Sequence, residues 1–350
     1  MQGHEVVDAG VDASASELEA LLTLVLGLQR AIRAAVVEAT ERASLAELSA
    51  IADDGPGDTI YRIDKVSEEL LRRELEAAAP AIGGVVLIAE GIAGGELTLP
   101  AAPSVTPRWR MIIDPIDGTR GIMYQKRSAW VLTGVAPNRG PSTRLSDVVL
   151  AVQTEIPTLK QHLCDELWAV RGAGANLRRV NRFTGASEAL PISPSRAKSL
   201  HHGYAMLTRF FPGARDELAA IDEELMLALL GGSPEGKALC FEDQYASTGG
   251  QLYELMVGHD RFNADLRPLM HALLERRGQP KGLCCHPYDM CTALIAREAG
   301  VLLTDPYGQA LDMPLDVEAD VAWVGYANRA LRELVEPVLS ACLARRGLAR

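Results

Sequence analysis

The sequence predicts a chain of mixed structure, α+β or α/β, with two sheet-containing subdomains. Helical spacing in Ala-, Leu- and Glu-rich stretches opens the chain, and two continuous apolar runs at 85–89 and 109–113 each end at a carboxylate. After residue 196, strands alternate with helices. The pattern changes near residue 192, so we divide the chain into an N-terminal subdomain, residues 1–192, and a C-terminal subdomain, residues 193–350.

The composition is that of a globular enzyme. Of the 350 residues, 48% are hydrophobic and 23% are charged, which excludes a mainly disordered chain. The formal net charge is −11 and no block of Lys or Arg is present, so we expect no nucleic-acid partner. An acidic protein that binds a phosphate gains from a divalent cation, because carboxylates alone would repel the phosphate.

The first residues give no targeting signal. Residues 1–5 lack a basic region, and the apolar run at 21–28 is too short for a membrane span. We therefore expect a cytoplasmic protein with no membrane contact. Cys284, Cys285 and Cys291 lie close together, but no second pair has zinc-ribbon spacing, and we interpret them as reduced, partly buried thiols.

The first half of the chain reads as helices followed by a sheet. Helical spacing predicts one long helix over 16–50, with one break allowed, and a second helix over 66–79 after a Gly-Pro-Gly loop at 55–57. Asp64 lies just before the second helix, where an acid commonly caps the first turn. Apolar runs then predict the strands of a mixed or antiparallel sheet, at 85–89, 109–113, 129–135, 148–153 and 167–170.

The second half alternates between the two kinds of element. Helical spacing and apolar runs predict helices at 217–230, 249–257, 290–299 and 331–343, and strands at 261–267 (ending in a polar turn), 301–304 and 322–325. Asp289 falls at or before the first turn of the helix over 290–299, which Gly300 ends.

The sequence DPIDGT, which begins at Asp114, places two carboxylates at the end of an apolar strand. Pro115 fixes its own φ and restricts Asp114, so we expect the chain to leave the strand in a turn that aims both carboxylates at one point. The carbonyl of Ile116 would supply the neutral oxygen that hard cations accept. A helix beginning at Gly118 and Thr119 would bind an anion. The alternative is a structural turn with an Asx-type hydrogen bond.

This motif resembles the signature of the inositol monophosphatase family, within the wider group of metal-dependent, lithium-sensitive sugar phosphatases that includes fructose-1,6-bisphosphatase. Three further matches occur in the same order. They are Asp64 before a helix, the strand that ends at Glu90, and residues 288–308, which resemble the family's second signature and contain Asp289. The resemblance covers residues 55–330 and implies the layered α-β-α-β-α fold of these phosphatases.

The resemblance also implies an activity, the Mg²⁺-dependent hydrolysis of a small polyol or sugar phosphate, and a homodimer. The implied ligands of two or three Mg²⁺ ions are Glu90, Asp114, the carbonyl of Ile116, Asp117 and Asp289. The phosphate would bind the N–H groups of Gly118 and Thr119. Asp64 and Thr119 would orient and deprotonate the attacking, metal-bound water, and Glu90 would belong to the catalytic group as well as to the metal shell.

One departure from the family pattern concerns the metal shell. Gly91 stands where the family usually has a second Glu after Glu90. One outer carboxylate is therefore missing, and we expect altered metal affinity or geometry.

Other departures concern the substrate. Tyr288 replaces the family's usual Trp, and the position of a sugar-contacting acid falls near Gly282, so inositol specificity is not implied. Arg261, Arg267 and Lys281 would be available for a second anionic group, as in a fructose-1,6-bisphosphate-like substrate. The alternative interpretation makes Arg261 and Arg267 solvated surface charges.

Two further interpretations stay open at this point. A catalytically weak phosphate-binding or regulatory protein would keep the same motifs, and Gly91 favours it. A 3'-phosphoadenosine nucleotide would be hydrolysed by the same chemistry as a sugar phosphate.

Overall fold

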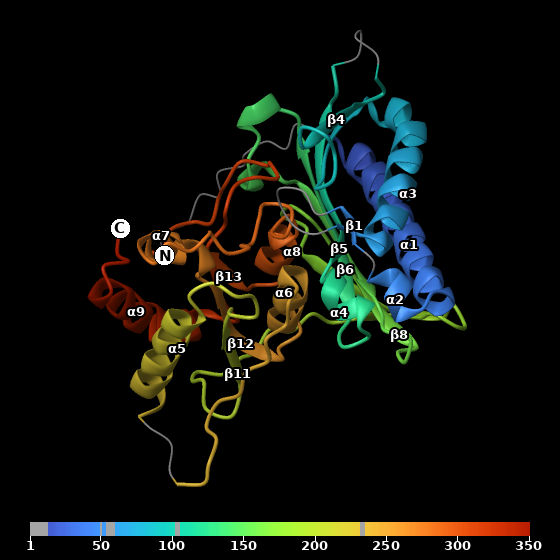
Figure 1. Ribbon diagram of the computed structural model, residues 1–350. Coiled ribbons are helices and arrows are strands. Elements are labelled where there is room, and N and C mark those ends of the chain that lie inside the picture. Colours follow the sequence, from blue (N-terminus) through green and yellow to red (C-terminus); the bar gives the residue numbers. More distant parts are fainter. Residues whose placement is uncertain (1–12, 50, 54–59, 102–105, 232–234) are drawn as a thin grey trace, which may run out of the picture.

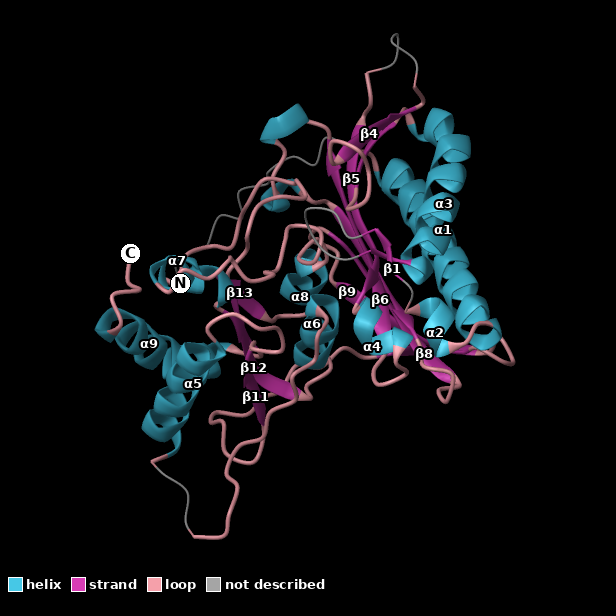
Figure 2. Cartoon of the chain, in the orientation of Figure 1, coloured by secondary structure: helices cyan, strands magenta, loops and turns pink. Residues whose placement is uncertain are grey.

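Two β-sheets and three layers of helices alternate in the computed structural model, which describes residues 13–49, 51–53, 60–101, 106–231 and 235–350 (Figure 1). The predicted loop at 55–57 lies outside these residues. The layers follow the predicted α-β-α-β-α order (Figure 2). The helices are α1 (Ala15–Arg42) and α3 (Arg62–Ala78) outside the larger sheet, α6 (Thr248–Met256) and α8 (Ala293–Glu298) between the sheets, and α5 (Arg215–Leu230) and α9 (Arg329–Arg345) outside the smaller sheet.

In the described chain the larger sheet has eight strands, in the order β10-β9-β8-β7-β6-β5-β3-β4. β3 and β5 are parallel and the other neighbours are antiparallel, so the predicted mixed sheet is confirmed. The strands are β3 (Val85–Ile88), β4 (Glu96–Leu99), β5 (Trp109–Asp117), β6 (Ala129–Pro137), β7 (Leu150–Ile156), β8 (Leu163–Val170), β9 (Ala175–Asn181) and β10 (Ser187–Leu190).

Three strands of this sheet carry no clear sequence signal. β4 and β10 are the two edge strands, β9 is the strand next to β10, and most of the residues of these three strands are polar and at least partly exposed. Strands at or beside an edge need no apolar run when their faces are half solvated. A small separate hairpin is formed by β1 (Ile51–Asp53) and β2 (Ile60–Tyr61), which pair antiparallel.

β3 and β5 bring the two carboxylate-bearing ends of the apolar runs to one edge. All of β3 is buried, and β3 and β5 run in parallel register from Val85 opposite Trp109 to Ile88 opposite Ile112. The predicted end of β5 at residue 113 is wrong, because the strand continues to Asp117. Asp114 faces Leu132 and Asp117 faces Trp130, so three steps along β5 match two along β6. Such a bulge accommodates a proline that cannot join the ladder.

α1 packs along the larger sheet as a core helix. Ser14 and Glu17 form a capping box at its start. The predicted single break falls after Arg42, where Ser44 caps the short helix α2 (Leu45–Leu48).

By length and hydropathy alone α1 could also cross a membrane, contrary to the expectation from the run at 21–28. In the fold, however, polar side chains of α1 form hydrogen bonds and ion pairs with the larger sheet. Gln29 Nε2 donates to Thr133 Oγ1 at 2.8 Å and to the Val152 carbonyl at 2.9 Å. Arg30 and Arg33 form ion pairs with the buried Glu166 at 3.1 and 3.0 Å. These bonds, with the buried apolar face, account for the helix's composition without a membrane.

The smaller sheet has the strand order β11-β12-β14-β13. β11 and β12 are parallel, whereas the β12–β14 and β13–β14 pairs are antiparallel. The strands are β11 (Tyr204–Leu207), β12 (Asp260–Asp265), β13 (Leu302–Thr304) and β14 (Trp323–Tyr326). The predictions near 261, 301 and 322 are confirmed, and β11 was not predicted.

The helix predicted over 290–299 begins later than expected. α8 starts at Ala293, and residues before it form turns in which Asp289 N donates to the His286 carbonyl and Met290 N to that of Pro287. Asp289 therefore lies on a turn and not in a helix. Two further short helices are α4 (Thr119–Met123) and α7 (His271–Arg276).

Both sheets share one apolar core. Ile112 of β5 and Phe262 of β12 belong to the same cluster of buried side chains. A second cluster lies between the larger sheet and α1 with α3. The predicted division at residue 192 falls between Leu190 of β10 and Tyr204 of β11. Because one core is shared by both sheets, the division into two subdomains stays a prediction.

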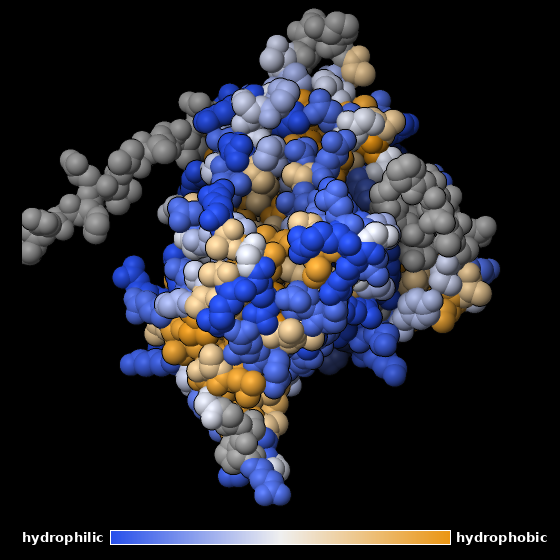
Figure 3. Space-filling view, turned by 60° about the vertical axis from the view of Figure 1, so that its left-hand side comes forward, coloured by the Kyte–Doolittle hydropathy of each residue, from blue (hydrophilic) through white to orange (hydrophobic). Residues whose placement is uncertain are grey.

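The surface is mostly hydrophilic on the face shown in Figure 3, with hydrophobic residues gathered toward its lower part. Among the described residues, exposed large hydrophobic side chains include Leu227 of α5 together with Tyr204 and Phe241, whose rings lie 5.5 Å apart. The predicted homodimer is not assigned to any of these surfaces and stays a prediction.

Candidate active site

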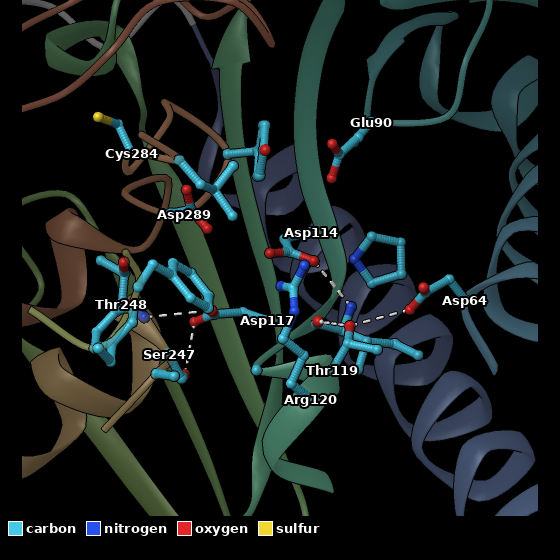
Figure 4. A pocket seen from close by; sticks show the side chains of 18 of the residues that line it. Asp64, Glu90, Asp114, Asp117, Thr119, Arg120, Ser247, Thr248, Cys284 and Asp289 are labelled. Atoms are coloured by element: carbon cyan, nitrogen blue, oxygen red, sulfur yellow. Dashed lines mark hydrogen bonds between the residues drawn. The ribbon is translucent and has the colours of Figure 1, made fainter. Parts of the chain in front are cut away.

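Three carboxylates converge in a cleft at the end of β5. Oxygens of Asp114, Asp117 and Asp289 all lie within 4.8 Å of one another (Figure 4). The first two residues flank the bulge of β5, and Asp289 comes from the turn before α8. The site thus joins the larger sheet to the layer between the sheets.

Asp117 is held by the N-terminus of α6. Its carboxylate accepts hydrogen bonds from Ser247 Oγ at 2.8 Å, from Gly249 N at 2.6 Å and from Thr248 N at 3.3 Å. The first N–H groups of a helix have no partner within the helix and carry its positive dipole end, so they favour a carboxylate. The sequence analysis predicted a helix over 249–257 but did not predict this support of Asp117. Ser247 as an N-cap before a helical pattern was the available signal.

Asp114 and Asp289 are fixed by local backbone donors. Ile116 N donates to Asp114 Oδ1 at 2.9 Å, and His286 N donates to Asp289 Oδ2 at 2.6 Å. The first is the Asx-type bond of the alternative interpretation. The structure shows that this bond and the carboxylate cluster coexist, because a carboxylate has lone pairs for both a backbone N–H and a further ligand.

Burial makes the negative charge of this cluster costly. It raises the pKa of Asp114 and of Asp289 well above the ordinary value, and the neighbouring charge of Asp117 raises both further. Burial raises the pKa of Asp117 to about 6, although the hydrogen bonds from Ser247, Gly249 and Thr248 oppose the shift. Carboxylates so close together in a low-dielectric site need either protons or a cation.

Glu90 and Asp64 face the same cleft from two other elements (Figure 4). Glu90 follows β3, and its charge adds to the upward shifts in the pKa of Asp114 and Asp289. Asp64 lies in the first turn of α3, not before the helix as predicted. Thr119 Oγ1 is 3.0 Å from Asp64 Oδ1 and 2.8 Å from the Ile116 carbonyl, so its one proton is shared between two acceptors.

Gly118 makes the reversal between β5 and α4 possible. Its φ is +98°, a conformation that residues with a side chain rarely adopt. A Cβ there would also lie 3.1 Å from the Cβ of Ser247. The predicted helix start at Thr119 is present, and Gly118 and Thr119 line the same cleft as the carboxylates.

Glu68 occupies the place left by Gly91. It lies one helical turn after Asp64 and lines the cleft. A Cβ at Gly91 would lie 2.6 Å from Glu68 Oε1, so the carboxylate fills the space of a side chain at residue 91. Burial raises the pKa of Glu68. α3 therefore places a carboxylate beside Gly91, and the i, i+4 spacing from Asp64 was its sequence signal.

The structure does not bring Arg261 and Lys281 to the cleft formed by the described residues. Arg261 Nη1 donates to the Ser199 carbonyl at 2.9 Å, and Lys281 is exposed. Arg267 does line the cleft, but it is bound to Asp265 through Nε at 2.9 Å and Nη2 at 2.6 Å. Its charge is therefore largely neutralised within the protein.

Another cation and two aromatic rings, which sequence reasoning missed, complete the wall. Arg120 of α4 lies over the ring of Phe211 at 5.0 Å, and the rings of Phe210 and Phe211 are 4.8 Å apart. All three line the cleft. Nothing in the local sequence marks the pair of Phe residues as cleft residues, because they follow the unpredicted strand β11.

Known proteins resemble this chain in structure but not in sequence. No family model and no curated protein sequence matches the chain. The extragenic suppressor protein SuhB from Bartonella henselae is similar in structure, with a TM-score of 0.61, 16% identity, and coverage of 91% of this chain and 98% of that one. The Leishmania major fructose-1,6-bisphosphatase in its holo form gives a TM-score of 0.66 and 14% identity, with 96% of each chain covered.

The Thermotoga maritima inositol monophosphatase also matches, with a TM-score of 0.59, 16% identity, and coverage of 93% of this chain and 99% of that one. The chain has the fold of the inositol monophosphatases and fructose-1,6-bisphosphatases. The fold that the DPIDGT motif implies is thus confirmed. Identities this low show the fold alone, so the ligand and catalytic roles within this phosphatase fold stay predictions.

Proposed function

We propose that the protein is a Mg²⁺-dependent phosphomonoesterase that hydrolyses a small polyol or sugar phosphate. The observation that carries the proposal is the meeting of Asp114, Asp117 and Asp289 beside the paired Asp64 and Thr119. A buried group of acids next to a helix start suits a cation and the phosphate that it neutralises. The phosphatase fold of the similar structures supports the same reaction class.

The donor atoms fit magnesium. The three converging side chains offer only carboxylate oxygens, which hard cations prefer. Glu90 and the carbonyl of Ile116 lie on the same cleft, so the proposed ligand set is Glu90, Asp114, Ile116, Asp117 and Asp289. Bound Mg²⁺, as two or three ions, would lower the pKa of the attacking water and neutralise charge on the phosphate.

The remaining residues position the reactants. Thr119 Oγ1, held between Asp64 and the Ile116 carbonyl, would orient the attacking water, and Asp64 would take its proton. The N–H groups of Gly118 and Thr119 would bind the phosphate oxygens. Arg120 would bind a second anionic group of the substrate. This is the role that the sequence suggested for Arg261, Arg267 and Lys281.

A phosphate-release panel tests the proposal. The purified protein is incubated with inositol phosphates, sugar monophosphates, fructose-1,6-bisphosphate and a 3'-phosphoadenosine nucleotide, with and without Mg²⁺. We expect Mg²⁺-dependent release of phosphate from at least one of them. No turnover on any substrate, with Mg²⁺ binding shown by calorimetry, would favour the phosphate-binding or regulatory alternative.

The nucleotide arm of the panel rests on a specific observation. Phe210 and Phe211 line the cleft, and aromatic rings stack on bases. The sequence argument for the regulatory alternative was Gly91, and the carboxylate of Glu68 beside Gly91 supports the enzyme instead. The cytoplasmic location and the homodimer remain proposals.

Glu68→Gln is expected to lower kcat or the apparent Mg²⁺ affinity about tenfold or more, as removal of an outer carboxylate around a metal typically does. The measurement is phosphate release as a function of Mg²⁺ concentration on the best substrate of the panel. Glu69→Gln is the matched control, since Glu69 is the next residue of α3 and is exposed. Equal kinetics for the two variants would remove Glu68 from the site.

A further inference from the structure

A second cluster of side chains with metal-binding donor atoms lies beside the cleft, and its Cys284 lines the cleft. Atoms of His271, Cys284 and Asp320 all lie within 4.8 Å of one another. His271 Nε2 is 3.2 Å from Cys284 Sγ, and His271 Nδ1 is 3.6 Å from Asp320 Oδ2. The cluster therefore contains an imidazole, a thiol and a carboxylate. His286 approaches both this cluster and the aspartates, with Nε2 3.9 Å from Asp320 Oδ1 and Nδ1 3.9 Å from Asp289 Oδ2.

Three separate segments bring these side chains together. His271 begins α7, Cys284 and His286 lie on the stretch before Asp289, and Asp320 precedes the smaller sheet's strand β14. A backbone hydrogen bond from Val321 N to the Cys285 carbonyl, 2.8 Å long, holds the second and third segments side by side. The cluster is therefore positioned by the fold and is not a chance meeting of flexible surface chains.

We propose that His271, Cys284 and Asp320 bind a divalent metal of the zinc class. Nitrogen and sulfur donors select zinc-like cations, whereas magnesium takes oxygen donors. Three protein ligands of these kinds, with one position left for water, match the number and kind found in open zinc sites. This site is chemically distinct from the all-oxygen cluster of Asp114, Asp117 and Asp289.

A neighbouring contact orients His286 toward the carboxylate of Asp320. His286 Nδ1 is 3.1 Å from Tyr288 Oη, and the two rings stack with centroids 5.2 Å apart. The other nitrogen, Nε2, faces Asp320 Oδ1. Carboxylates that bind metals commonly have such polar neighbours, which hold them in position.

Metal binding requires the thiolate of Cys284, so the Sγ–H bond breaks, the Sγ–metal bond forms and the proton leaves to solvent. Burial raises the pKa of the Cys284 thiol to about 12, so the metal-free site holds the neutral thiol. A metal bound at this second site would also stiffen the segment that carries Asp289, since His286 N donates to Asp289 Oδ2 at 2.6 Å.

Cobalt titration tests the proposal without any activity assay. The full-length protein, stripped with a chelator and supplied with excess Mg²⁺, is titrated with Co²⁺, and the near-ultraviolet absorption of thiolate-to-cobalt charge transfer is recorded. We expect one equivalent of Co²⁺ per chain to produce the band, and Zn²⁺ to abolish it by displacement. Absence of the band in the wild-type protein would overturn the proposal.

Variants assign the ligands. Cys284→Ser is expected to lose the band, whereas Cys285→Ser, the adjacent buried thiol whose Sγ contacts Thr248 Oγ1 instead, should keep it. Asp320 is exposed, so we expect the Asp320→Ala variant to fold normally. This variant should bind Co²⁺ at least about tenfold more weakly. A band that survives in Cys284→Ser, or wild-type affinity in Asp320→Ala, would overturn the assignment.

Discussion

Asp114→Asn is expected to lower Mg²⁺-dependent phosphate release by about a thousandfold or more, because a metal clamp supplies several kcal/mol of transition-state stabilisation. Besides burial, the charges of Asp117, Asp289 and Glu90 all raise the pKa of Asp114. The amide keeps the oxygen that can accept from Ile116 N, so the local turn is retained. The measurements are turnover on the best substrate and Mg²⁺ affinity by calorimetry.

Asp260→Asn is the matched control for this variant. Asp260 is also buried, burial raises its pKa to about 6, and it does not line the cleft. Its amide variant should retain activity and Mg²⁺ dependence. An active Asp114→Asn enzyme with a normal circular dichroism spectrum would contradict the metal assignment.

Mg²⁺ is expected to raise the melting temperature strongly at pH 8 and only weakly at pH 5. The pKa of Asp117 is about 6 in the folded protein and that of Asp114 and Asp289 is higher than ordinary. Between the unfolded value, near 3.8, and these raised values the folded state binds more protons than the unfolded state. Without metal, stability therefore falls as the pH rises through this window, by about 1.4 kcal/mol per pH unit for each proton.

A divalent metal replaces those protons, so bound Mg²⁺ should reduce the change in protein stability with pH in this window. Asp222 and Asp260, whose pKa values burial raises to about 6, would leave a slope that does not depend on Mg²⁺. Thermal scans from pH 5 to 8 with Mg²⁺, and with NaCl at equal ionic strength, separate the two contributions. An equal shift with NaCl, or none at pH 8, would show that the aspartates do not hold the ion.

The sequence predicts the parts of this fold that depend on burial. β3 and β5 are recognisable because both faces are covered, which leaves continuous apolar runs. β10 is a polar edge strand and β9 is its polar neighbour, and neither has such a run. The bulge at Pro115 and the late start of α8 were missed because they depend on pairing with β6 and on turns, which a helical spacing pattern does not encode.

The candidate site divides in the same way. The acids and the turn at Gly118 can be predicted from local sequence, because a proline, a glycine and carboxylates follow one another at the end of a strand. The support of Asp117 by α6 joins residues 130 positions apart, and no local pattern contains it. Sequence spacing also cannot show that Arg267 is already bound to Asp265, or that Arg261 donates to backbone carbonyls.

The two walls of the cleft differ in how firmly the fold constrains them. The carboxylates lie on β5 and beside α6, where the core fixes the backbone, whereas Phe210 and Phe211 lie on the connection between β11 and α5. Connections accept substitutions and changes of length more readily than strands do. Descendants of one ancestor could therefore diverge in the ligand that this cleft accepts through residues 208–214 alone, while inheriting the carboxylates of β5 unchanged.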